Sequence, residues 1–208
     1  MKSLALYILT FFALTYVSAQ FPTIEIGERV PFQTYEMRNV DGSTCSIEDI
    51  AGENGALVIF TCNSCPFVVG RGDKVEGWEG RYNNIIELAA SEGIGSILVN
   101  SNSAKRTKED NISAMKNRAH DMEYSVPYVV DEESKLANGF GARTTPHVFL
   151  FDGELDLIYM GSIDDNVDSL EKVEEHYLIN AIERHAAGKR IRKDTTAPRG
   201  CSIKRVKK

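Results

Sequence analysis

The stretch that decides the fold is Val58-Ile59-Phe60-Thr61-Cys62-Asn63-Ser64-Cys65-Pro66-Phe67. An apolar run typical of a buried strand ends here in a Cys-x-x-Cys pair, and a helix-like pattern follows. Backbone N–H groups and the helix dipole favour a thiolate at a helix N-terminus. We therefore expect Cys62, as the more exposed sulfur at that terminus, to attack substrates and Cys65 to resolve the mixed disulfide. The stretch predicts thiol–disulfide exchange.

Two structural interpretations compete with redox chemistry. A zinc site normally needs a second Cys-x-x-Cys or a Cys/His pair, whereas Cys45 and Cys201 are isolated in the sequence. A purely structural disulfide across so short a loop removes little chain entropy from the unfolded state. Redox use is the preferred interpretation, and we expect no metal and no cofactor apart from the redox-active Cys62–Cys65 disulfide.

The N-terminus has the order of a secretory signal. One positive charge in Met1–Ser3 precedes an apolar stretch, Leu4–Val17, and the small residues Ser18 and Ala19 follow. This order predicts a cleavable signal over residues 1–19. The apolar stretch is shorter than the ~20 residues of a spanning helix, which disfavours the alternative of an uncleaved anchor. We expect a secreted or periplasmic protein that does not span the membrane after cleavage, in a compartment where disulfides persist.

The remaining chain divides by charge into a domain over residues 20–188 and a basic tail over residues 189–208. From Arg184 to Lys208 there are ten Lys or Arg and one acid, whereas Gln20 to Glu183 has a net charge of about −16. Such an acidic body argues against nucleic-acid binding. We expect the tail to lie on this body; the alternative is contact with an anionic surface.

Apolar patterning predicts strands alternating with helices. Strands are expected over residues 33–40, 56–60, 94–99, 128–130, 148–151 and 155–160, and helices over 46–50, 66–90, 111–122, 133–140 and 170–187. Glycines predict an interruption early in the 66–90 helix. This order describes an α/β fold of three layers, with a central mixed β-sheet flanked by helices. The cysteine pair follows the first central strand, a usual place for function in such sheets.

A second landmark is Arg143-Thr144-Thr145-Pro146-His147, which enters a strand about 80 residues after the cysteines. It resembles the thioredoxin-like superfamily, in which a Thr-Pro with a cis bond faces the active-site disulfide. The resemblance implies that the backbone of Thr145 is free to bind an extended substrate peptide, with Pro146, His147 and Pro66 beside it. Two alternatives stay open: Pro146 as an ordinary strand-entry proline, and His147 as a structural residue.

Within that superfamily the chain is similar to the redoxin, or AhpC/TSA-type, branch over roughly residues 32–204. The matching segments are 62–68, 99–102, 127–132, 141–152, 161–166 and 200–204. The resemblance implies an exported thiol–disulfide oxidoreductase that acts on protein thiols or disulfides and uses an unidentified electron donor or acceptor.

Three other functions stay open. A peroxiredoxin-like antioxidant peroxidase is disfavoured, because Gly55 and Ile59 stand where such enzymes carry Pro and Thr or Ser before the reactive cysteine. A Sco-like copper-handling protein could use His147 or His120 with the two thiolates, although that family has one more residue between its cysteines. An interaction domain with idle cysteines is disfavoured by the intact Cys-x-x-Cys and Thr-Pro.

Cys45 and Cys201 have three possible uses. They could form a structural disulfide that ties the tail to the first hairpin, or remain separate buried thiols. Cys201 could also act as a third redox cysteine on a mobile arm.

Overall fold

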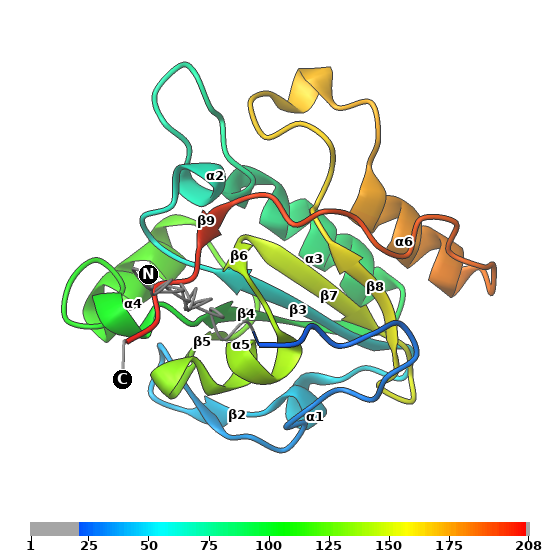
Figure 1. The fold of residues 1–208 in the computed structure, drawn as a ribbon, viewed down its shortest axis with the longest axis horizontal. Helices are drawn as coiled ribbons and strands as arrows, with labels where there is room; N and C mark the ends of the chain where they lie inside the picture. Colours follow the sequence, from blue (N-terminus) through cyan, green and yellow to red (C-terminus); the bar gives the residue numbers. More distant parts are fainter. Residues whose placement is uncertain (1–20, 207–208) are drawn as a thin grey trace, which may run out of the picture.

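The computed structural model of the protein describes residues 21–206, so the predicted signal over residues 1–19 lies outside it. A mixed sheet with helices on both faces gives the expected three-layer α/β architecture (Figure 1). The strands are β1 (Met37–Asn39), β2 (Thr44–Cys45), β3 (Gly55–Thr61), β4 (Ile94–Asn100), β5 (Tyr128–Val130), β6 (Thr144–Thr145), β7 (His147–Phe151), β8 (Leu157–Gly161) and β9 (Cys201–Ser202). The helices are α1 (Ile47–Ile50), α2 (Pro66–Val69), α3 (Tyr82–Ser91), α4 (Ile112–Asp121), α5 (Lys135–Phe140) and α6 (Tyr177–Ala186), with short 3-10 turns η1 (Glu79–Arg81), η2 (Ser103–Lys105), η3 (Glu132–Ser134) and η4 (Leu170–Lys172).

The central sheet has the strand order β2-β1-β5-β4-β3-β7-β8 among the described residues. Strands β3, β4 and β5 run parallel. Strand β7 pairs antiparallel with β3, and β1 pairs antiparallel with β5, whereas β8 pairs antiparallel with β7 and so runs in the direction of β3. Every residue of β3 is buried, because the strand lies in the middle of the sheet with helices on both faces. The cysteine pair therefore directly follows a fully buried strand in the middle of the sheet.

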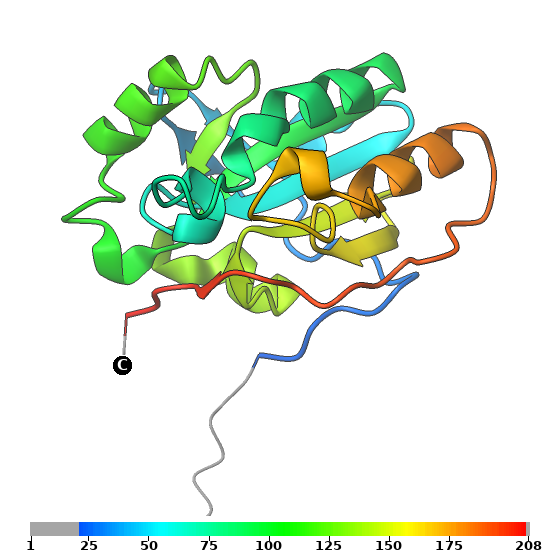
Figure 2. The same cartoon turned by 90° about the horizontal axis from the view of Figure 1, so that it is seen from above.

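Alternate residues of β3 divide the core into two layers. Leu57 and Ile59 face a layer built with helices α3, α4 and α6, while Val58 and Phe60 face a layer built with α1 and α5. Figure 2 shows α3 and α6 together on one face of the sheet. This two-sided packing follows from the alternation of side chains along a strand.

The predicted interruption of the 66–90 helix is present, since α2 ends at Val69 and α3 begins at Tyr82. The prediction of a helix from Leu170 was wrong, because α6 begins only at Tyr177. Asp165 explains the delay: its side chain accepts a hydrogen bond from the Glu174 N–H, and its own N–H donates to the Glu175 carbonyl. These bonds hold residues 173–176 in a non-helical path.

The C-terminal segment runs from the end of α6 back across the domain to β9, as the orange-to-red chain in Figure 1 shows. On the way it lies along β8, where the Met160 N–H donates to the Asp194 carbonyl and the Thr196 N–H donates to the Met160 carbonyl, both at 3.0 Å. Lys193 forms an ion pair with Glu175 of the acidic body. The tail therefore lies on the body, as expected, and its short strand β9 reaches the cysteine pair.

Candidate active site

The cysteine pair occupies the step from β3 to α2. Cys62 follows the last residue of β3, and Cys65 is the N-cap of α2, with Pro66 half-buried in the first helical position. The N–H groups of Val68 and Val69 donate to the Cys65 carbonyl at 2.8 and 2.9 Å. Proline at the first helical position starts a helix readily, because its φ is already helical and its missing N–H would have no partner there.

The expectation that Cys62 lies exposed at the helix N-terminus was wrong on both counts. Cys62 is 2% exposed and Cys65 is 3% exposed, so both sulfurs are buried. The helix begins after Cys65 because Pro66 fixes its first turn there, which leaves Cys62 in the connection from the strand. The helical N–H groups are therefore closest to Cys65.

The two sulfurs converge on Thr145, which is itself buried. The Cys62 Sγ lies 3.2 Å from the Thr145 hydroxyl oxygen. The Cys65 thiol donates to the Thr145 carbonyl oxygen at 3.1 Å. The peptide bond between Thr145 and Pro146 is cis, and Pro146 is buried. Thr145, which lies 83 positions after Cys62 in the sequence, thus makes polar contacts with both sulfurs of the pair.

Hydrogen bonding between the two thiols shifts their pKa values in opposite directions. It lowers the pKa of Cys65 to about 5, with a further contribution from the thiol and backbone N–H of Cys201. The same hydrogen bond, together with burial, raises the pKa of Cys62 above its usual range. The Thr145 carbonyl acts in the other direction on Cys65, because it can accept a hydrogen bond only from the protonated thiol. The first negative charge of the reduced pair forms on Cys65.

A buried carboxylate holds Asn63, the first of the two residues between the cysteines. Asp110 accepts hydrogen bonds from the Asn63 N–H at 2.8 Å and from the side-chain amides of Asn100 and Asn102 at 2.9 Å. The Tyr128 hydroxyl donates to the Asn63 side-chain oxygen at 2.9 Å. The sequence analysis expected no helix or strand between residues 99 and 111 and did not single out Asp110. The available signal was an acidic residue shortly after the Asn100–Asn102 motif at the end of a buried strand.

His147 packs inside the domain. Its side chain is 2% exposed, its ring lies 4.4 Å from that of Phe149, and its Nδ1 accepts the Arg143 N–H at 3.3 Å. Burial lowers the pKa of His147 to about 3, so the ring is neutral at physiological pH. These contacts favour the structural alternative for His147 over proton handling.

The structure does not bring Cys45 to Cys201. Cys45 lies in β2 and packs on the α1 and α5 side of the sheet, whereas Cys201 packs against Cys65 and Val68. Strands β2 and β9 lie at opposite sides of the domain in Figure 1. The structure therefore does not support the alternative in which Cys45 and Cys201 form a disulfide between the tail and the first hairpin. All four cysteines are free thiols.

Thr145 is not open to a substrate strand, which corrects a second expectation. Strand β9 pairs antiparallel with β6, and Cys201 stands opposite Thr145. The edge that was expected to bind an extended peptide is therefore covered by the chain's own C-terminal segment.

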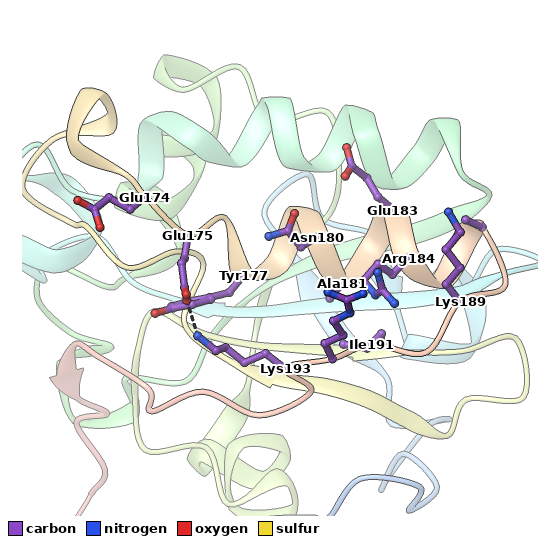
Figure 3. A pocket seen from close by; sticks show the side chains of 12 residues that line it. Glu174, Glu175, Tyr177, Asn180, Ala181, Glu183, Arg184, Lys189, Ile191 and Lys193 are labelled. Atoms are coloured by element: carbon purple, nitrogen blue, oxygen red, sulfur yellow. Dashed lines mark hydrogen bonds and ion pairs between the residues drawn. The ribbon is translucent and has the colours of Figure 1, made fainter.

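A separate hollow of about 530 Å³ lies between α6 and the tail. Figure 3 shows its charged lining, with the ion pair between Lys193 and Glu175 at one end. Within residues 21–206, no cysteine lines this hollow. It is therefore separate from the thiol chemistry.

No group of three His, Cys, Asp or Glu side chains within residues 21–206 is arranged to hold a metal ion. His120, one candidate copper ligand, has a side chain that is 89% exposed and pairs with Asp121. In the same part of the chain, no helix is both long enough and apolar enough to cross a membrane.

Comparisons with known proteins agree with this architecture. A sequence model of the Redoxin family matches residues 20–175. The structure resembles that of an uncharacterized conserved protein from Geobacillus kaustophilus, with a TM-score of 0.77 and 26% identity over 91% of this chain and 95% of that one. It also resembles a hypothetical protein from Sinorhizobium meliloti 1021, with a TM-score of 0.78 and 26% identity over 90% and 98% of the two chains.

A more distant similarity is to a thioredoxin-like protein from Aeropyrum pernix, with a TM-score of 0.51 and 12% identity over 75% of this chain and 89% of that one. This similarity confirms the predicted thioredoxin-like fold. No curated protein sequence matches the chain.

Proposed function

The chain belongs to the Redoxin family, and from this premise we propose that it is a thiol–disulfide oxidoreductase that uses Cys62 and Cys65 as its redox pair. One observation carries the proposal: both sulfurs converge on Thr145, one at 3.2 Å from its hydroxyl and the other at 3.1 Å from its carbonyl. A pair held in this way can cycle between dithiol and disulfide with little movement of the backbone.

The acidities of the two thiols assign their roles in exchange. An exchange step is faster when the departing sulfur has a low pKa. The pKa of Cys65 is about 5, so an incoming thiolate attacks Cys62 and expels Cys65. In the reverse direction Cys62 forms the mixed disulfide with a substrate, and the Cys65 thiolate resolves it. This assignment retains Cys62 as the substrate-linked cysteine, although its thiol is the less acidic one.

The substrates proposed are protein thiols or disulfides outside the cytoplasm, with a separate electron donor or acceptor. This part of the proposal is supported by the signal-like segment at residues 1–19 and by the chemistry of disulfides in oxidising compartments.

Peroxide reduction is not part of the proposal. The two positions that would orient a peroxide before Cys62 lie within β3, where Ile59 is fully buried in the core and Gly55 packs against the Phe151 carbonyl. The nearby Thr61 hydroxyl is hydrogen-bonded to Tyr82 at 3.1 Å. None of these three positions supplies a hydroxyl to Cys62.

The reduction potential of the pair tests the proposal. The protein with Cys45 and Cys201 replaced by serine is equilibrated in buffers of defined glutathione ratio, quenched with acid, alkylated and measured by mass spectrometry. A single two-electron transition is expected. A potential near −270 mV would indicate a reductant and one near −120 mV an oxidant. Failure to form a Cys62–Cys65 disulfide at any ratio would refute the proposed function.

A further inference from the structure

Strand β9 places a third cysteine against the redox pair. Cys201 stands opposite Thr145 in the antiparallel pairing of β9 with β6. Its backbone N–H donates to the Cys65 Sγ at 3.3 Å, and its side chain packs in the same small cluster as Cys62 and Cys65. Three of the four cysteines of the chain therefore meet at one point.

This position is fixed on both sides of Cys201. Gly200 packs so closely on the Thr145–Pro146 backbone that an added Cβ would lie 2.3 Å from the Thr145 carbonyl oxygen. After Cys201, the Ile203 N–H donates to the Arg143 carbonyl at 3.0 Å, and the Lys204 N–H donates to the Asn102 side chain at 2.8 Å. The contact between Cys201 and Cys65 is therefore part of an anchored strand.

The location of β9 suggests its use. Strand β9 covers the edge of β6 at Thr145, where the sequence analysis expected an extended substrate peptide to bind. Cys201 therefore occupies the position in which a cysteine of a bound substrate would lie. Cys201 is half-buried, whereas Cys62 is only 2% exposed. Of the three sulfurs, Cys201 is the one on the solvent side.

We propose that Cys201 is a third redox thiol that exchanges with the Cys62–Cys65 disulfide and connects it to an external thiol reductant. The proposal rests on the proposed function of the pair.

In the first step the Cys201 thiolate attacks the Cys65 Sγ of the Cys62–Cys65 disulfide. The bond between Cys65 and Cys201 forms, the bond between Cys62 and Cys65 breaks, and Cys62 leaves as a thiolate that takes up the proton given by Cys201. The hydrogen bond with Cys65 that raises the pKa of Cys62 in the reduced protein is absent once Cys65 is bonded to Cys201. The Thr145 hydroxyl, 3.2 Å from the Cys62 sulfur, can also donate to this leaving thiolate. The step moves one disulfide within the protein and leaves its oxidation state unchanged.

In the second step a thiol RSH attacks the half-buried Cys201 sulfur and expels the Cys65 thiolate. A second RSH then releases Cys201 and forms RSSR, so two thiols are oxidised and the protein disulfide is reduced. Cys62 serves the substrate and Cys201 serves the reductant, with Cys65 shared between them.

The acidity of Cys201 favours attack by its thiolate on the oxidised pair. Burial and the neighbouring Cys65 sulfur raise the pKa of Cys201 to about 11 in the reduced protein. Disulfide formation between Cys62 and Cys65 removes the negative charge of Cys65, which is one of the causes of that shift. Cys201 therefore becomes the stronger nucleophile when there is a disulfide to attack.

Peptide mapping of the full chain tests the proposal. The Cys62→Ser and Cys62→Ala variants are oxidised with glutathione disulfide, quenched with acid, alkylated and digested. The expected product is an internal Cys65–Cys201 disulfide in more than half of the molecules. Free or glutathionylated Cys65 as the main product in both variants would overturn the inference.

Kinetics provide the second readout. Oxidised Cys201→Ser protein should be reduced by glutathione at least tenfold more slowly than the wild type, while Cys45→Ser, the matched control remote from the pair, should change the rate less than twofold. Equal rates for the wild type and Cys201→Ser would overturn the inference. The Cys201→Ser variant must still form the Cys62–Cys65 disulfide; if it does not, the proposed function itself fails, so the two failures are distinguishable.

Discussion

Replacing Gly200 by alanine should detach β9 from the redox pair. The added Cβ would lie 2.3 Å from the Thr145 carbonyl oxygen and 2.7 Å from the Thr145 carbonyl carbon, whereas ordinary contacts begin near 3.4 Å. Both atoms belong to the backbone beside the cis Pro146, so the clash must be relieved mainly by moving β9 outward by about 1 Å. Overpacking of this kind typically costs ~1–3 kcal/mol of folding free energy.

The same movement should change the acidity of the pair. An outward shift of that size breaks the 3.3 Å hydrogen bond from the Cys201 N–H to the Cys65 sulfur. A hydrogen bond to a charged group contributes ~1.5–3 kcal/mol, and one pKa unit corresponds to ~1.4 kcal/mol, so the pKa of Cys65 should rise by ~1–2 units. The starting value is about 5.

Two measurements check this prediction on the reduced protein. Thiolate absorbance near 240 nm, followed against pH, gives the pKa, and urea unfolding gives the loss of stability. The matched control is Gly80→Ala, since an added Cβ at Gly80 meets no atom within 4 Å. If Gly200→Ala kept both the stability and the thiolate titration of Gly80→Ala, β9 would not be docked as described.

Three further outcomes follow from the structure. Folding lowers the pKa of Cys65 to about 5 from an ordinary ~8.5, so the unfolded chain binds one more proton between these pH values. The free energy of unfolding of the reduced protein, measured in urea, should therefore rise from pH 5 to 8.5 and lose this contribution as the pH falls through 5. The Cys65→Ser variant should lack this pH dependence. Thr145→Val, which removes the hydroxyl 3.2 Å from the substrate-linked sulfur, should slow reduction by dithiothreitol about tenfold in stopped-flow measurements, whereas Thr145→Ser should retain the rate. Arg118→Ala leaves the buried Glu79 carboxylate without its ion-pair partner and should cost ~3–5 kcal/mol in urea unfolding, against less than ~1 kcal/mol for Arg29→Ala at an exposed pair; equal costs would contradict the assigned burial.

The parts of the fold that depend on local apolar patterning were predictable. The continuous apolar runs that became β3 and β4 indicated buried strands, and the strand at Tyr128–Val130 was predicted with its observed bounds. The proximity of the cysteine pair and the Thr-Pro was also predictable, because the resemblance to the thioredoxin-like superfamily implies that the two motifs face each other. Helix boundaries such as Tyr177 were not predictable, since this one depends on the hydrogen bonds that Asp165 makes with Glu174 and Glu175.

The missed parts of the site depend on contacts between distant segments. Strand β9 has two residues and lies in a basic tail without an apolar run, so its pattern carries no strand signal. Asp110 joins the site only because Asn63, Asn100 and Asn102 converge on it from two other segments. The reversal of the expected acidities comes first from the hydrogen bond between the two thiols, which lowers the pKa of Cys65. The contact of Cys65 with Cys201 of the distant tail lowers it further.

The tail lies in direct contact with the cysteine pair, and under the proposals above the two act together. If β9 were only a cover, a substrate would have to displace it before reaching a Cys62 sulfur that is 2% exposed, and the hydrogen bond that helps to keep Cys65 acidic would be lost at the moment of exchange. If Cys201 takes part in exchange, the reducing half of the cycle proceeds with β9 in place and the acidity of Cys65 is kept for the step in which it leaves. The second arrangement uses every contact of the site, and it requires a cysteine at position 201, where serine would preserve the backbone pairing but not the chemistry.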